Sequence, residues 1–431
     1  CQRRDHTRSS PRSNRSSRIV YAMALRVALN QVLRRSKPQS IALRAFASTS
    51  DVPKPAPVMD VPQRILMGPG PSNSHPRALA AMAMPMLGHM HPPFLKIMDE
   101  ISDYLRYLFQ TDSKYTCAIS GSGHMAMEAA IANVLEPGEK ILVGDNGIWG
   151  SRVCDLSDRY GLEVVALKKP AGETYSLAEL EAAVKEHKPQ ALFLCQGESS
   201  AGTMQQIEGV GAITKANDCF LIVDTVCTLG GVPFKADAWD VDVVYSGGQK
   251  ALSAPPGASP FMMNERAMQK LQSRKTKVAT YNCDLKLIGD YWGWYGGRSY
   301  HHTGPISNFY SLREALAITC EEGLEPLWAR HQAMFELLWK GLGEIGLEPY
   351  VKDPKSRLPC VNTIAVPAGV DGPALSNFAM QKYNLEIAGG LGPTAGKVWR
   401  IGVMGYNAHP MNVNLVVTAF KEGLEAQGYK K

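Results

Sequence analysis

Val241-Asp-Val-Val-Tyr-Ser-Gly-Gly-Gln-Lys250 combines an apolar run, a glycine-rich turn and a lysine in ten consecutive residues. The β-branched and aromatic residues of the run are typical of a buried strand, and the paired glycines predict a turn directly after it. A second apolar run, Phe220-Leu-Ile-Val-Asp224, ends on an acid 26 residues before the lysine. The two runs predict strands that each deliver a polar residue at the carboxyl end.

The same pattern extends upstream, where short apolar runs alternate with helical patterns such as 125–135. This alternation predicts βα units, and therefore an α/β fold with a mostly parallel sheet flanked by helices. Because ligand sites in such sheets lie at the carboxyl ends of the strands, we expect Ser120-Gly-Ser-Gly-His124, Asp224 and the Lys250 loop to be neighbours. The other predicted strands are 115–120, 140–144, 163–167 and 191–195.

After residue 311 a long helical stretch leads to a second region. There Cys360-Val-Asn-Thr-Ile-Ala-Val366 and Val398-Trp-Arg-Ile-Gly402 predict strands of a smaller C-terminal α+β domain. The expected organisation is a basic leader at 1–50, an N-terminal linker and extension at 51–80, a large domain at 81–310 and a small domain at 311–431.

The charge of the chain is unevenly distributed. Residues 1–50 carry 11 Lys/Arg and one Asp, which leaves 35 Lys/Arg and 39 Asp/Glu in the rest of the 431 residues. The body is therefore mildly acidic and shows no basic stripe with interleaved aromatic residues, so we expect no nucleic-acid partner. No apolar run approaches the length of a membrane span, so we expect no membrane partner either.

The N-terminal segment is typical of a mitochondrial transit peptide. From Met23, a plausible initiator, to Ser50 there is no acid, and several arginines accompany apolar residues that share one helical face. A disordered basic tail is the alternative interpretation. We expect the mitochondrial matrix as the location, with the peroxisome as the alternative, although Tyr429-Lys-Lys431 lacks the leucine that usually ends a peroxisomal address.

Metal-ligand spacing is not apparent in the sequence. The nine cysteines are dispersed with no C-x-x-C pair, which predicts reduced thiols. Tyr300-His-His-Thr303 and His89-Met-His91 are rich in histidine, but no Cys or carboxylate completes a set with metal-like spacing. We therefore expect no metal.

Several residues suit a phosphate-bearing cofactor whose carbonyl reacts with an amine. Lys250 could form an imine, or be an ordinary loop lysine. Asp224 could pair with a protonated ring nitrogen, or cap a helix. The glycines after Ser120 could admit a phosphate at a helix N-terminus, or form a plain turn, and Trp149 could stack on a ring or pack under its loop. Arg400, inside an apolar strand, requires a carboxylate from a substrate or from a structural acid.

These segments together resemble the alanine–glyoxylate / serine–pyruvate aminotransferase family of fold-type I enzymes, which depend on pyridoxal 5′-phosphate (PLP). The resemblance covers about residues 61–425 and is specific because the segments occur in order. They are Gly68-Pro-Gly-Pro-Ser-Asn73, Ser120-Gly-Ser-Gly-His124, Asn146-Gly-Ile-Trp-Gly150, Gly197-Glu-Ser-Ser200, Val223-Asp-Thr225, Ser246-Gly-Gly-Gln-Lys250 and Tyr300-His-His-Thr303.

The resemblance implies a role for each matching residue. Lys250 would carry PLP as a Schiff base and move the proton, Asp224 would bind the ring nitrogen, and Trp149 would stack on the ring. Arg400 would hold the substrate carboxylate. The other implied roles are phosphate binding by Ser122, Gly123, His124 and Gln249, phosphate binding from the partner subunit of a homodimer by Tyr300 and Thr303, support of cofactor and substrate by Ser199, and substrate binding by Gly70 and Asn73.

The implied reaction is ping-pong transamination between amino acids and 2-oxo acids. Alanine and glyoxylate, giving pyruvate and glycine, are the expected pair, and serine with pyruvate is a second expected activity. Relatives of the same group also accept 3-hydroxykynurenine or kynurenine, which is one alternative. The other is a cysteine desulfurase-like PLP lyase, although Gln249 stands where such enzymes usually carry histidine, and Cys360 adjoins a strand-like run.

Overall fold

The computed structural model describes residue 57 and residues 59–430 of the chain. Within them, residues from Gln63 onward belong to one compact unit. The predicted leader at 1–50, with the initiator at Met23, lies outside the described residues.

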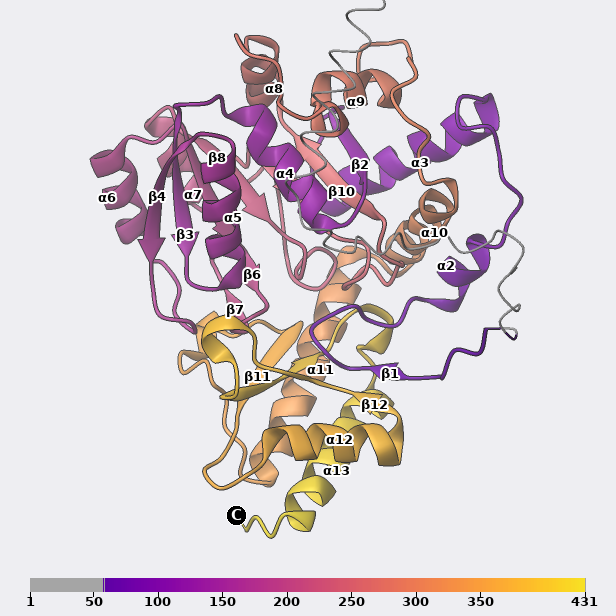
Figure 1. Cartoon of the computed structure of the whole chain (residues 1–431), viewed down its shortest axis with the longest axis vertical. Helices are drawn as coiled ribbons and strands as arrows, with labels where there is room; N and C mark the ends of the chain where they lie inside the picture. Colours follow the sequence, from indigo (N-terminus) through magenta and orange to yellow (C-terminus); the bar gives the residue numbers. More distant parts are fainter. Residues whose placement is uncertain (1–56, 58, 431) are drawn as a thin grey trace, which may run out of the picture. The chain divides into compact units, whose positions relative to one another are not determined.

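A seven-stranded sheet forms the centre of the unit (Figure 1). All neighbouring strands pair in parallel except at β10, which runs antiparallel to both of its neighbours. The predicted α/β fold with a mostly parallel sheet is therefore confirmed. In the order of pairing, the strands are β2 (Thr116–Ser120), β10 (Ala258–Met263), β9 (Val243–Tyr245), β8 (Phe220–Asp224), β5 (Ala191–Cys195), β3 (Lys140–Asp145) and β4 (Glu163–Lys168).

Strand β10 is the one member of this sheet that the sequence pattern did not predict. Its segment, Ala-Ser-Pro-Phe-Met-Met, contains Pro260, which has no N–H to donate to a neighbour. The Pro260 carbonyl nevertheless accepts a hydrogen bond from the Ser246 N–H, at 2.9 Å. Complete burial of all six residues, with Phe261, Met262 and Met263 in the main core, explains why tertiary packing outweighs the local signal.

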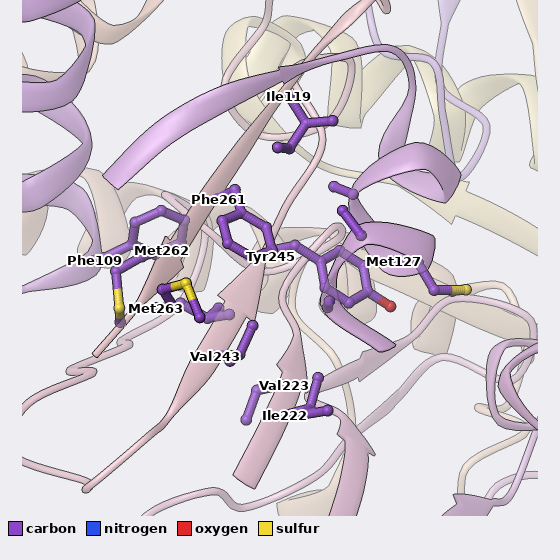
Figure 2. Close-up of a cluster of buried hydrophobic side chains, with 14 of the residues drawn as sticks. Phe109, Ile119, Met127, Ile222, Val223, Val243, Tyr245, Phe261, Met262 and Met263 are labelled. Carbon is purple, nitrogen blue, oxygen red and sulfur yellow. The ribbon is translucent and has the colours of Figure 1, made fainter. Parts of the chain in front are cut away.

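Helices cover the sheet and bury a continuous apolar core. Helix α4 (Gly123–Val134) packs on β9 and β10, α5 (Ile148–Arg159) packs on β3 and β4, and α3 (Pro92–Phe109) packs on β2. Figure 2 shows part of this core, in which Tyr245 lies among Val223, Val243 and Phe261. The remaining helices of this region are α2 (Pro76–Ala81), α6 (Leu177–His187), α7 (Val210–Ala216), α8 (Glu265–Gln272), α9 (Leu285–Trp292) and α10 (Ile306–Glu322).

A second apolar cluster lies around a three-stranded antiparallel sheet. Its strands pair in the order β11 (Val361–Ala365), β14 (Val398–Gly402) and β13 (Ala388–Gly389). The cluster contains Trp399 and Phe420 and also takes in Met67, from the other end of the unit. Its helices are α11 (Leu324–Glu344), α12 (Gly372–Tyr383) and α13 (Pro410–Ala426), and the two short ladders are β1 (Ile65–Leu66) with β12 (Leu385–Glu386) and β6 (Gly197–Glu198) with β7 (Thr203–Met204).

The long helical stretch predicted after residue 311 is interrupted at Gly323. This glycine has a φ of 84°, which L side chains rarely adopt, and it separates α10 from α11. Leu312, Ala315 and Leu316 of α10 pack in the large core, and Leu338 and Leu342 of α11 pack in the small one. The domain boundaries at 80/81 and 310/311 stay predictions. In the part of the chain that the structure describes, no helix is sufficiently long and apolar to cross a bilayer.

Candidate active site

The register of the large sheet brings Asp224 to the centre of its carboxyl edge. Asp224 ends β8, where it lies opposite Cys195 of β5 on one side and Tyr245 of β9 on the other. Ser120 ends β2 and pairs with Ala258 of β10. Strand ends that are far apart in the sequence therefore meet at one edge of the sheet.

The Asp224 carboxylate is buried and held by two donors. One oxygen accepts a hydrogen bond from the Val226 N–H at 2.7 Å, and the other accepts one from the Tyr245 hydroxyl at 2.8 Å. Burial raises the pKa of Asp224 to about 6, although these two donors and the charge of Lys250 oppose the shift. A cation beside this acid would offset the cost of burying its charge.

Lys250 is buried and directed toward the loop at 68–73. Its Nζ donates a hydrogen bond to the Pro69 carbonyl at 2.5 Å. A Cβ placed on Gly70 would lie 2.2 Å from Nζ, and Gly70 has a φ of 121°, so both space and backbone conformation favour glycine there. Residue 70 therefore lies directly against the amine.

Trp149 is fixed at both its backbone and its ring. The backbone N–H donates to Glu198 Oε2 at 3.0 Å, and the indole N–H donates to Ser199 Oγ at 2.8 Å. His124 lies edge-on to the indole, with 5.5 Å between the ring centroids. The orientation of the half-buried Trp149 is thus set by the hairpin of β6 and β7, where Glu198 and Ser199 lie.

Arg400 forms no salt bridge within residues 57 and 59–430, and both hydrogen bonds described for its side chain go to carbonyls. Nε donates to the Gly389 carbonyl at 2.7 Å, and Nη1 donates to the Ser199 carbonyl at 3.2 Å. The side chain is buried on β14, and burial lowers the pKa of the guanidinium. The charge of the buried Glu198 opposes this shift, but no acid of the described residues forms a salt bridge with Arg400, and a ligand carboxylate stays as the prediction.

The N-terminus of α4 directly follows β2. Ser122 is the N-cap residue but forms no side-chain cap, and Gly123 opens the helix. A helix N-terminus leaves its first N–H groups unpaired and favours an anion. In the turn after β9, the side-chain oxygen of Gln249 is buried without a partner in the described chain. These groups suit a phosphate, since a rotated Gln249 amide would present donors.

Asn73 and Gln249 also hold the loop at 68–73 in place. The Asn73 side chain bonds to the Leu66 N–H at 2.8 Å and to the Arg64 carbonyl at 3.0 Å. The Gln249 carbonyl accepts a hydrogen bond from the Ser72 N–H at 2.9 Å. Asn73 is therefore engaged in supporting the loop, and its predicted contact with substrate stays a prediction.

Tyr300 and Thr303 lie apart from this constellation within the described chain. Tyr300 is 63% exposed and contacts His89, with 5.4 Å between the rings, and Thr303 is exposed. Neither forms a hydrogen bond or ring contact with Lys250 or Asp224 in the part of the chain that the structure describes. Between them, His302 lies 2.5 Å from the Ser120 hydroxyl and therefore anchors the segment beside the loop that opens α4.

Glu198 is a buried acid of the site that the sequence analysis did not single out. It is 1% exposed, and its carboxylate accepts hydrogen bonds from Trp149 and Ser200. Burial raises the pKa of Glu198 to about 7. The Gly-Glu-Ser-Ser segment has the composition of a polar loop, so only the burial found in the fold reveals this residue.

Two further features lie outside the constellation. A cavity of about 260 Å³ has His75, Ser253 and Tyr406 in its lining and includes none of the predicted site residues. Cys360 is fully buried, and burial raises the pKa of its thiol, so it does not have the exposed, ionised character of a reactive cysteine.

Comparison with known proteins identifies the family. Residues 74–408 match the family model for class-V aminotransferases. An alanine–glyoxylate aminotransferase from Callithrix jacchus is 47% identical over 374 residues, covering 86% of this chain and 90% of the relative. An (S)-ureidoglycine–glyoxylate transaminase from Bacillus subtilis is 33% identical, covering 85% of this chain and 90% of the relative.

A solved structure agrees with these relatives. The crystal structure of an alanine–glyoxylate aminotransferase from Nostoc sp. is 47% identical and superposes with a TM-score of 0.84, covering 86% of this chain and 98% of that one. The buried amine of Lys250, the buried acid at Asp224 and the orphaned Gln249 oxygen suit the cofactor of this family. This chain therefore belongs to the class-V aminotransferase family and is a PLP-dependent aminotransferase.

Proposed function

We propose that this enzyme transfers the amino group of alanine to glyoxylate, giving pyruvate and glycine. The single observation that carries the proposal is the burial of Lys250, Asp224 and Arg400, with Arg400 forming no salt bridge in the described chain. The relatives that share 47% of their residues over most of this chain carry that activity in their names. Serine with pyruvate is the second activity that we propose.

Each residue contributes a separate physical function. PLP, when bound, supplies an electron sink next to the substrate Cα. Asp224, held by Val226 and Tyr245, is positioned to keep a proton on a ring nitrogen, because a buried carboxylate favours a cationic partner. Lys250 is the base that takes the proton from the substrate Cα, since its amine is buried and fixed by the Pro69 carbonyl.

Substrate selection rests on Arg400 and on the loop at 68–73. The planar guanidinium fits a carboxylate with two parallel hydrogen bonds, which explains a preference for α-amino and α-oxo acids. Glyoxylate is the acceptor in the names of both the alanine and the ureidoglycine enzymes described above, so the acceptor is the more constant partner among the relatives. The desulfurase alternative is disfavoured, because Cys360 is buried.

We propose in addition that the enzyme is a homodimer with shared sites. Tyr300 is 63% exposed, and the exposed Met84 and Met86, at 58% and 68%, add apolar surface that a second copy could cover. In such a dimer, Tyr300 and Thr303 would reach the phosphate at the partner's site.

The first prediction concerns the reaction. We expect the purified enzyme to transfer the amino group fastest from alanine to glyoxylate. Serine and 3-hydroxykynurenine, each assayed with glyoxylate or pyruvate as acceptor, should react more slowly. Lys250→Ala should abolish turnover and the visible absorption band of the imine with PLP, because alanine has no amine to form that bond. A faster reaction with 3-hydroxykynurenine would assign the alternative donor instead.

The second prediction concerns Asp224. Its raised folded pKa means that ionisation costs stability as the pH rises through about 6, so the cofactor-free Asp224→Asn variant should melt no earlier than the parent at neutral pH. We expect kcat to fall about 100-fold or more, because the neutral amide cannot stabilise a cationic ring. Unchanged turnover, measured at saturating PLP, would exclude the electrostatic role.

The third prediction concerns Arg400. Arg400→Ala should raise KM for both amino acid and oxo acid by about 30-fold or more, with PLP still bound, because the substrate carboxylate loses its charged partner. Arg159→Ala is the matched control, since that arginine is exposed on α5. Lost PLP with unchanged KM would mean that Arg400 serves the cofactor.

The fourth prediction tests the shared site. Chains carrying Lys250→Ala and chains carrying both Tyr300→Ala and Thr303→Ala should each be inactive alone. After mixing and subunit exchange, we expect about a quarter of the parental activity, because half of the dimers then hold one intact site. Activity that stays absent after exchange, verified by differently tagged chains, would place these residues at their own chain's site.

A further inference from the structure

Glu198 is buried beside the proposed active site and forms no salt bridge within residues 57 and 59–430. The negative charge of Asp224 raises the pKa of Glu198, and the charge of Glu198 raises the pKa of Arg400. A buried carboxylate outside a salt bridge is costly, so the fold retains it only with compensating donors.

Three donors converge on this carboxylate. Oε1 accepts hydrogen bonds from the Ser200 N–H at 2.9 Å and the Ser200 hydroxyl at 2.6 Å, and Oε2 accepts one from the Trp149 N–H at 3.0 Å. The Ser200 hydroxyl oxygen also accepts the Ile148 N–H at 3.2 Å. Glu198 and Ser200 therefore satisfy the first N–H groups of α5, the helix that carries Trp149.

The Glu198 side chain packs closely against the residue that precedes α5. A Cβ on Gly147, the residue before α5, would lie 2.3 Å from the Glu198 Cδ. The start of α5 therefore lies directly against the carboxylate, and the backbone position of Trp149 depends on the length and orientation of this side chain.

The next residue in the chain extends this link to the substrate side. Ser199 accepts the indole N–H of Trp149 through its hydroxyl and the guanidinium of Arg400 through its carbonyl. Two consecutive residues thus hold the backbone and the ring of Trp149 and one edge of Arg400.

We infer that Glu198 is a positioning residue that fixes the ring of Trp149 against PLP and, through Ser199, fixes the position of that ring relative to Arg400. The inference rests on the proposed function, in which Trp149 stacks on the cofactor. A carboxylate suits this position because all three groups that face it are donors. Glutamine would turn its NH2 toward at least one of them.

The experiment is a double-mutant cycle on cofactor retention, with Glu198→Gln, Trp149→Ala and the double variant. Trp149→Ala removes the ring but keeps the backbone N–H that Glu198 accepts. The readouts are the release of PLP from the diluted holoenzyme and the visible circular dichroism per bound PLP. We expect Glu198→Gln to speed release about tenfold in the parent and less than about threefold in Trp149→Ala, because the side chain acts through the ring.

A matched control and a stability measurement separate positioning from folding. Glu208→Gln changes an exposed acid ten residues along the chain and should alter neither readout. The inference would be overturned if Glu198→Gln sped the release of PLP equally in the parent and in Trp149→Ala. It would also be overturned if Glu198→Gln left the visible circular dichroism unchanged in both backgrounds. If Glu198→Gln does not fold, Ser200→Ala tests the same link, since it removes one donor and the Ile148 contact.

The outcome is distinguishable from failure of the proposed function. A parent that binds no PLP, or binds it without transferring an amino group, contradicts the function itself. If the parent binds PLP and transaminates, but the effects of Glu198→Gln and Trp149→Ala on PLP release are additive, only the role of Glu198 is contradicted. Movement of KM for alanine in Glu198→Gln at saturating PLP would support the extension of the link to Arg400.

Discussion

Burial of a carboxylate at the central strand end is the constraint on which the rest of this site depends. Asp224 is removed from water among strands that supply few polar groups, so its charge is tolerated only with the Val226 and Tyr245 donors and a neighbouring cation. Tyr245 provides the hydroxyl from within the main apolar core (Figure 2). The packing of the sheet and the electrostatics of the site are therefore properties of the same side chain.

The other polar residues of the site are likewise fixed by the packing of the elements that carry them. Each polar group that faces the site belongs to an element whose packing fixes it: Lys250 to the turn after β9, Arg400 to β14 and Trp149 to the start of α5. Hydrogen bonds to backbone carbonyls hold Lys250 and Arg400, and neither cation forms a salt bridge in the described chain. Such an arrangement suits anionic ligands, because the ligand supplies the missing charge.

Sequence patterns predicted strands accurately where apolar runs are bounded by turn residues, as in β5, β8 and β14. They missed β10, because Pro260 disfavours a central strand locally, whereas complete burial decides the outcome. They also missed Glu198, because a polar segment gives no sign of its depth in the fold. Ordered motifs selected Lys250 and Asp224, and a charge inside an apolar run selected Arg400. That Arg400 forms no salt bridge in the described residues follows only from the tertiary structure.

The path of the chain through its two cores has a consequence for how the enzyme is made. Met67 packs in a cluster otherwise built from residues 338–424, and Gly402 donates a hydrogen bond to the Met67 carbonyl at 2.8 Å, two residues before the carbonyl that holds Lys250. During synthesis, the segment around Met67 therefore leaves the ribosome long before residues 338–424, on which it packs. The amine of Lys250 therefore acquires its final surroundings only when almost the entire polypeptide has been synthesised.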